Sequence, residues 1–276
     1  SPVIVVTHCE DSPMIWAAEE AARQKYGEDV PMSEHPNIRS ADACYASSSL
    51  AIELARKHDA LLHVLHLTTE KEMAQFTPGV RAGKRVTAEV CVHHLWFDES
   101  RYEELGTKIK CNPAIKRATD RQALVAAVND GRIDVIATDH APHLAEEKAN
   151  AYFKAPAGLP LVQHAVQVLF DLAARGSISH ELIVDRVCHA PADIFGVGER
   201  GYVREGYFAD LVIVDPDRPV KVDAADVLYK CGWSPFEGHT FTSSIDTTIV
   251  NGTVVYEDGA LSGEIPGRRL HFTRQR

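Results

Sequence analysis

Three candidate metal ligands, His8, His66 and Asp139, each stand at or near the end of an apolar run, and His143 lies just beyond the third. Alternation along its strand places His63 on the opposite face from His66, and His66 lies closer to the C-terminal end, so we favour it as the ligand. Imidazole nitrogens and carboxylate oxygens suit Zn²⁺ and similar divalent ions. These residue types predict a metal site, a general base, or both.

Up to about residue 196 the sequence alternates between apolar strands and amphipathic helices. These elements must position the candidate ligands. The predicted strands are Val3–Thr7, Leu61–Leu67, Arg85–Val92 and Val135–Ala137. The predicted helices are Ser12–Lys25, Ser40–His58, Thr69–Gln75, Asp120–Asn129, Leu161–Arg175, His180–Cys188 and Pro191–Phe195. This alternation predicts a parallel α/β sheet or barrel, with the candidate ligands at the carboxyl ends of its strands. The β-branched run that opens the chain predicts a strand buried on both faces.

The last part of the chain follows a different pattern. Asp210–Asp215 predicts a strand with no helix behind it, and Asn251-Gly252, between two short apolar runs, is a strong type I′ hairpin signal. We therefore expect a partial α/β barrel of the TIM type over residues 1–200 and a small β subdomain over residues 201–276.

Composition excludes several classes of protein. The chain has 276 residues and a formal net charge of −10, which argues against nucleic acid and anionic membranes as partners. No apolar run approaches the ~20 residues that span a bilayer, and the first residues lack the basic segment of a signal peptide. The six cysteines form no Cys-x-x-Cys pair, so they read as reduced thiols of a cytoplasmic protein.

Each candidate residue also has an ordinary structural explanation. A lone histidine at a strand end is usually a hydrogen-bonded structural residue, and Asp139 would suit a helix cap. His93 and His94 are further candidate ligands, but adjacent residues on a strand face opposite ways, so both cannot bind one ion. Alone, Asn112-Pro113 reads as a turn, and Ala155–Pro160 as a glycine-containing loop that a ligand could approach closely.

Taken together, the segments resemble dihydroorotases of the longer bacterial type, within the amidohydrolase superfamily. The resemblance covers nearly the whole chain, and Thr138–His143 is its most specific part because hydantoinases usually lack the final histidine at that spacing. The matching segments are Thr7–Asp11, His63–Thr69, His93–Leu95, Asn112–Lys116, Ala137–His143, Ala190–Gly196, Gly206–Val212, Trp233–Gly238 and Val250–Gly252.

The resemblance implies a (β/α)₈ barrel with a small β domain built from both chain ends. The implied reaction is the reversible cyclisation of N-carbamoyl-L-aspartate to L-dihydroorotate in pyrimidine synthesis, with two Zn²⁺ per intact site. Zinc lowers the pKa of bound water to about 7, so hydroxide is available at neutral pH. The implied roles are His8 and His66 as ligands of one zinc, and Asp139 as ligand of the other and proton carrier. The implied substrate contacts are Asn112, His143, Ala157 and Gly158.

Some features of the family are missing from the matching region. The family's first strand carries a His-x-His pair and an arginine, and a later strand carries a bridging lysine or aspartate; none is present here. We therefore expect a C-terminal portion of the enzyme, an incomplete site that is inactive alone, and association with the missing barrel half or with a second copy. The rivals are an allantoinase or hydantoinase, and a non-catalytic dihydroorotase-like partner protein.

Overall fold

The computed structural model describes residues 3–273, which group into two compact units. The first unit contains residues 3–165 and 223–237, and the second contains residues 166–222 and 238–273.

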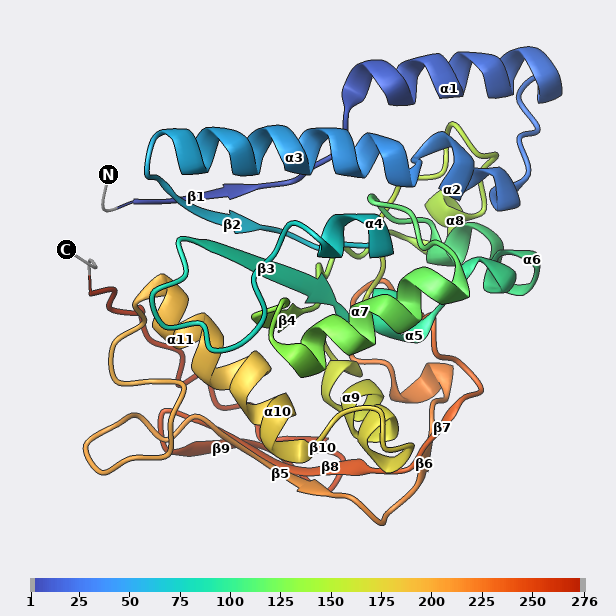
Figure 1. The fold of residues 1–276 in the computed structure, drawn as a ribbon. Helices are drawn as coiled ribbons and strands as arrows, with labels where there is room; N and C mark the ends of the chain where they lie inside the picture. The colour runs from blue at the N-terminus through green and yellow to red at the C-terminus, as the bar shows by residue number, and fades with distance from the viewer. Residues whose placement is uncertain (1–2, 274–276) are drawn as a thin grey trace. The chain divides into compact units, whose positions relative to one another are not determined.

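A four-stranded parallel sheet forms the centre of the first unit (Figure 1). Its strands lie in the order β1 (Ile4–Thr7), β2 (Leu61–Val64), β3 (Val86–Cys91) and β4 (Val135–Ala137). The register pairs the last residue of β1 with the last residue of β2, and the last residue of β3 with the last residue of β4. The four strands predicted from the sequence are confirmed, and their carboxyl ends share one edge of the sheet. The second is shorter than predicted, because β2 ends at Val64 and His66 lies in the segment that follows it.

Helices follow each of these strands, as the sequence predicts. Asp11 caps the first helix by accepting a hydrogen bond from the Met14 amide, and Ser40 caps the longest helix in the same way. The elements are α1 (Ser12–Tyr26), η1 (Met32–Glu34), α2 (His35–Ile38), α3 (Ala41–Lys57), α4 (Glu70–Met73), α5 (Val92–Trp96), η2 (Glu99–Arg101), α6 (Tyr102–Leu105), η3 (Gly106–Ile109), α7 (Ala118–Asp130), α8 (Ala145–Lys148) and η5 (Ala224–Asp226).

Two predictions about these strands are wrong. The first strand is not buried on both faces: Val5 is 53% exposed and Val6 46%, because among residues 3–273 only β2 pairs with it. The chain after β3 is not strand either, since Val92–Trp96 forms the short helix α5. His93 and His94 therefore do not point to opposite faces of a strand.

An antiparallel sheet dominates the second unit, with strand order β10-β9-β8-β5. The predicted hairpin is confirmed: Val250 pairs with Thr253, and both Asn251 and Gly252 have positive φ, as a type I′ turn requires. The elements are α9 (Ala165–Ala174, whose first residue groups with the first unit), α10 (His180–Val184), the π-helix η4 (Asp185–His189), α11 (Ala190–Phe195), β5 (Leu211–Asp215), β6 (Val220–Lys221), β7 (Thr240–Phe241), β8 (Ser244–Val250), β9 (Thr253–Glu257) and β10 (Ala260–Leu261).

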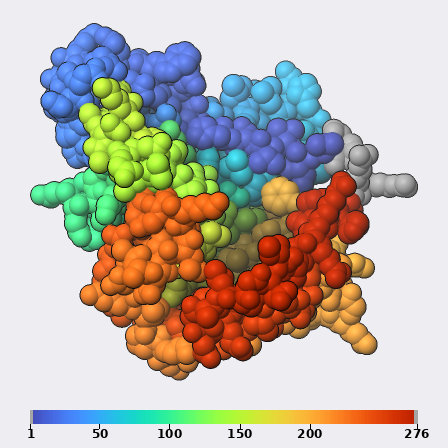
Figure 2. Space-filling model, turned by 180° about the vertical axis from the view of Figure 1, so that it is seen from behind, coloured from blue at the N-terminus to red at the C-terminus, as the bar shows by residue number. Residues whose placement is uncertain are grey.

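The segment around residue 150 packs against the first helices of the chain. Figure 2 shows it in yellow-green beside the blue of α1 and α2. His35 Nδ1 lies 2.8 Å from the Tyr152 hydroxyl, and the Arg23 guanidinium stacks 3.8 Å from the centre of the Phe153 ring. These contacts fix the loop that leaves α8.

No helix within residues 3–273 has the length and apolar character needed to cross a membrane.

Candidate functional site

The first two candidate ligands face each other at the carboxyl ends of neighbouring strands. His8 Nδ1 lies 3.1 Å from His66 Nε2, and the ring centroids are 4.9 Å apart. The strands are held together here by a hydrogen bond from the Leu65 amide to the Thr7 carbonyl. Two nitrogen ligands on one tetrahedral zinc lie about 3.3 Å apart, given Zn–N distances near 2.0–2.1 Å. The two facing nitrogens therefore fit a shared zinc ion.

Glu10 determines which nitrogen of His8 faces His66. Its buried carboxylate lies 3.0 Å from His8 Nε2 and also accepts from Arg39. Burial alone would raise the pKa of Glu10, but the His8 hydrogen bond and the Arg39 charge outweigh it and hold that pKa below its usual value. A carboxylate on the outer nitrogen fixes the tautomer of a metal-binding histidine and raises its basicity.

His66 and Asp139 both have a backbone conformation that residues other than glycine rarely adopt. Their φ angles are +34° and +47°, in the left-handed region where a Cβ is strained. Such conformations cluster at functional sites. Burial, and then the nearby His8, lower the pKa of His66, while the Asp139 charge opposes this shift. The His66 ring is therefore neutral at pH 7, the state that binds metal.

The Asp139 carboxylate does not form a compact group of ligand atoms with His8 and His66. Asp139 is exposed. Within residues 3–273, one group of three histidine, cysteine, aspartate or glutamate side chains has ligand atoms all within 4.8 Å of one another, and it consists of Cys91, His93 and His94. The structure thus pairs His8 with His66, places Asp139 electrostatically close to His66, and reveals a second cluster.

His63 has ordinary hydrogen-bond partners. Its ring nitrogens lie 2.9 Å from Thr87 Oγ1 and 3.3 Å from Glu89 Oε2, and the side chain is completely buried. Its role is packing between β2 and β3. His66, two residues beyond the end of β2, is the histidine that faces His8.

Asn112 offers an unpartnered polar atom. It precedes Pro113 across a cis peptide bond, and its Oδ1 is buried without a hydrogen-bond partner. Buried polar atoms are normally hydrogen-bonded, so an unpaired one suggests a ligand or water. The residue is thus suited to receive a ring N–H of a substrate.

His143 and the Ala157-Gly158 backbone are brought together. His143 Nε2 lies 3.1 Å from the Ala157 carbonyl oxygen, and the Trp233 indole donates to the His143 carbonyl at 2.8 Å. Gly158 has φ +139°, and a Cβ there would meet the Ala141 carbonyl oxygen at 2.5 Å and the His143 ring at 3.1 Å. Only glycine permits this close approach.

Lys148, at the end of α8, binds the carbonyl groups of this loop. Its buried ammonium donates to the carbonyls of Lys110 at 3.1 Å, Pro156 at 2.9 Å and Gly158 at 2.9 Å. Burial lowers its pKa to about 8. One ammonium thereby connects the loop, the segment between η3 and Asn112, and the helix that begins just after His143.

Lys110 supports the same loop. Its ammonium donates to the carbonyl oxygens of Tyr152 and Ala155, and its own carbonyl accepts from the Gly158 amide at 2.8 Å. The Gly158 N–H is therefore used internally. Among residues 3–273 nothing accepts from the Ala157 N–H, which leaves it as the loop donor available to a ligand. Neither lysine is predictable from the sequence, because a lysine among charged residues carries no signal of burial.

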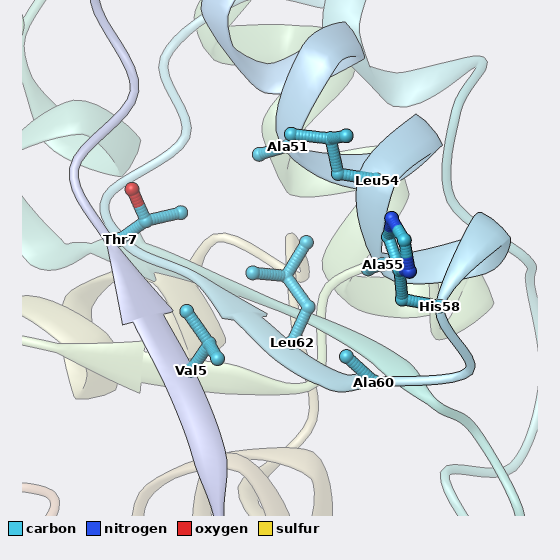
Figure 3. A pocket seen from close by; sticks show the side chains of 8 residues that line it. All are labelled: Val5, Thr7, Ala51, Leu54, Ala55, His58, Ala60 and Leu62. Atoms are coloured by element: carbon cyan, nitrogen blue, oxygen red, sulfur yellow. The ribbon is translucent and has the colours of Figure 1, made fainter. Parts of the chain in front are cut away.

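A hollow of about 330 Å³ lies elsewhere, between α3 and the sheet (Figure 3). It is lined by Val5, Thr7, Ala51, Leu54, Ala55, His58, Ala60 and Leu62. Its lining is nearly all apolar and includes none of the candidate ligands. A mostly apolar hollow without metal ligands does not suit catalysis, so the strand ends remain the candidate site.

Known proteins resemble the chain over most of its length. A dihydroorotase from Halobacterium salinarum is 34% identical over 268 residues, covering 97% of this chain and 60% of the relative. A dihydroorotase from Bacillus cytotoxicus is 34% identical over 256 residues, covering 92% and 58%. The solved L-hydantoinase (dihydropyrimidinase) of Arthrobacter aurescens superposes with a TM-score of 0.88 at 27% identity, covering 95% and 59%. The chain therefore spans about 60% of the length of the relatives it matches.

A model of the amidohydrolase family matches residues 4–255. That range includes the four parallel strands and the residues that face one another at their carboxyl ends. The chain belongs to the amidohydrolase family.

Proposed function

We propose that this chain carries the metal-binding and substrate-binding residues of a dihydroorotase. The reaction is the reversible hydrolysis of L-dihydroorotate to N-carbamoyl-L-aspartate, a step of pyrimidine synthesis. The observation that carries the proposal is the facing pair His8 Nδ1 and His66 Nε2, 3.1 Å apart at neighbouring strand ends. Similarity to relatives named dihydroorotase supports the choice of substrate.

The four parallel strands, in this proposal, are part of a (β/α)₈ barrel, and the antiparallel sheet is part of its β subdomain. The domain boundary near residue 200 and the number of zinc ions remain predictions. The proposed ligand is a small-molecule substrate. The proposed protein partner is a second copy of the chain or the rest of the barrel. The proposed location of the protein is the cytoplasm.

His8 and His66 would hold one zinc ion, and Asp139 would be a ligand of the other. When bound, zinc acts as a Lewis acid that polarises a carbonyl and makes water more acidic. Glu10 keeps His8 Nδ1 facing inward, since it occupies His8 Nε2. Burial keeps the imidazole of His66 neutral and able to bind.

Asp139 moves the proton. Its carboxylate accepts a proton from the attacking water as the oxygen–carbon bond forms at the ring amide. When the ring carbon–nitrogen bond breaks, Asp139 returns that proton to the leaving nitrogen, which balances the step.

The substrate is held by three groups in this proposal. Asn112 Oδ1 accepts a ring N–H, the Ala157 N–H donates to a ring carbonyl, and His143 donates to the substrate carboxylate or carbonyl. Lys148 keeps the loop in place through the Pro156 and Gly158 carbonyls.

Substitution of Asp139 tests the proposal. The natural gene product that carries these residues, loaded with zinc, should hydrolyse dihydroorotate, and Asp139→Asn should reduce kcat by about 10²–10⁴-fold. Glu103→Gln removes an exposed carboxylate on α6 and should leave kcat unchanged. Full activity in Asp139→Asn, or none in the unsubstituted protein, would contradict the proposal.

A further inference from the structure

A second group of metal-binding side chains lies where β3 passes into α5. Cys91 is the last residue of β3, and His93 and His94 lie on the first turn of the helix that follows. Their ligand atoms, one thiol and two ring nitrogens, all lie within 4.8 Å of one another. In a helix successive side chains turn by about 100°, whereas in a strand they turn by 180°, so both rings can lie on the same side. The ring centroids are 4.0 Å apart.

The cluster is buried, and among the described residues three of its four ring nitrogens lack a hydrogen-bond partner; the fourth, His94 Nε2, lies 3.1 Å from the Pro113 carbonyl oxygen. Cys91 and His93 are 0% exposed and His94 is 3% exposed. Within residues 3–273 neither ring nitrogen of His93 has a partner, and Nδ1 of His94 has none. Three unpaired ring nitrogens in one place are costly, and an ion is one of the few explanations for such a group.

The charge state of the cluster suits a cation. Burial lowers the pKa of His93 to about 3 and that of His94 well below its usual value, so both rings keep a free lone pair at neutral pH. Burial, followed by the carboxylates of Glu89 and Asp139, raises the pKa of the Cys91 thiol. Those carboxylates make the local potential negative, which favours a cation and opposes a bare thiolate.

We propose that Cys91, His93 and His94 form a buried site for Zn²⁺ or a similar thiophilic ion, separate from the His8–His66 pair. Thiolate sulfur and imidazole nitrogen are the ligand types that Zn²⁺ and other thiophilic ions take, and they are poor ligands for Mg²⁺ or Ca²⁺. Binding releases the Cys91 thiol proton to solvent, and the ion compensates the thiolate charge. Because the residues are buried, the ion enters during folding.

Sulfur distinguishes this site from the proposed catalytic centre, whose ligands are nitrogen and oxygen. The protein is refolded with Co²⁺, and the near-ultraviolet sulfur-to-cobalt charge-transfer band is recorded. We expect the band in the unsubstituted protein and in His8→Ala. We expect Cys91→Ser to abolish it, and Cys44→Ser, which removes another buried thiol, to retain it.

A second measurement covers the case in which Cys91→Ser does not fold. X-ray absorption at the zinc edge of the unsubstituted protein should show a sulfur neighbour at about 2.3 Å. His93→Gln should lower the zinc content by one ion per chain. Absence of both the cobalt band and the sulfur neighbour would overturn the proposal, and so would a band that survives in Cys91→Ser. Neither measurement depends on turnover, so a failed dihydroorotase assay would not affect the result.

Discussion

The Lys148 ammonium donates a hydrogen bond to the Gly158 carbonyl at 2.9 Å, and the loop of residues 149–157 connects the two residues. The same ammonium reaches the Lys110 and Pro156 carbonyls, so the segment before Asn112 and the loop of Ala157 and Gly158 share one positive charge. The loop is thus built around a buried cation, and its geometry depends on that charge.

Removing this ammonium should weaken substrate binding. We expect Lys148→Met to raise the Kd for dihydroorotate about tenfold or more, because a hydrogen bond from a charged group contributes about 1.5–3 kcal/mol. Calorimetric titration gives the Kd, and hydrogen exchange over residues 155–160 should quicken. Lys84→Met, which removes a buried lysine bound to Asp134, should leave both values unchanged. Equal effects in the two variants would mean that Lys148 acts only on stability.

Gly158 should not tolerate a side chain. An added Cβ would meet the Ala141 carbonyl oxygen at 2.5 Å, so Gly158→Ala must displace the loop that holds the Ala157 N–H. We expect a loss of about 1–3 kcal/mol in the free energy of unfolding and weaker binding of dihydroorotate. Gly232→Ala is the control, since Gly232 also has positive φ but nothing within 4 Å of the added atom. Similar losses in urea titrations of both variants would show that the close approach is not the cause.

Zinc binding should depend on the facing histidines. His8→Ala or His66→Ala removes one of two nitrogens that lie 3.1 Å apart, and we expect a loss of zinc affinity of at least about 100-fold at this site. His58→Ala removes an exposed histidine at the end of α3 and should have no effect. Competition with a chelator measures the affinity. Unchanged affinity in both site variants would rule out this pair as ligands.

The metal-free protein should be labile to acid. Burial lowers the pKa of His35 and His93 to about 3 and that of His164 to about 4. Between those values and about 6.5 the unfolded chain binds more protons than the folded chain, so the free energy of unfolding falls as pH falls. Each such histidine contributes up to about 1.4 kcal/mol per pH unit within that window.

Urea titrations of chelator-treated protein at pH 7.5, 6 and 5 measure how steeply the free energy of unfolding depends on pH. His35→Gln should make this dependence shallower, because one buried ring no longer has to be protonated on unfolding. His58→Gln, at an exposed position, should leave it unchanged. A free energy of unfolding that is constant over this range would contradict the burial argument.

The sequence predicted the strands that carry the site because apolar runs are visible in it. The type I′ hairpin at Asn251-Gly252 was equally visible, since few residue pairs accept two positive φ angles. Helix α5 was missed because Val92–Trp96 continues an apolar run, and nothing local distinguishes one helical turn from more strand. That error hid the approach of His93 to His94.

Other parts of the site depend on tertiary contacts that no local pattern encodes. The burial of Lys148 follows from the loop that folds over it, and a charged residue in a short helix normally predicts exposure. The positive φ of His66 and Asp139 likewise arises from the strand ends they follow. Sequence patterns identify these residues, whereas their partners become clear only in the fold.

Substrate preference is the most direct test of the central claim. The natural gene product that carries these residues, loaded with zinc, is assayed for hydrolysis of dihydroorotate, hydantoin and allantoin under the same conditions. We predict that kcat/KM for dihydroorotate exceeds the other two by at least about 100-fold, because only dihydroorotate offers a ring carboxylate to His143. Equal or greater kcat/KM for hydantoin or allantoin would contradict the dihydroorotase assignment.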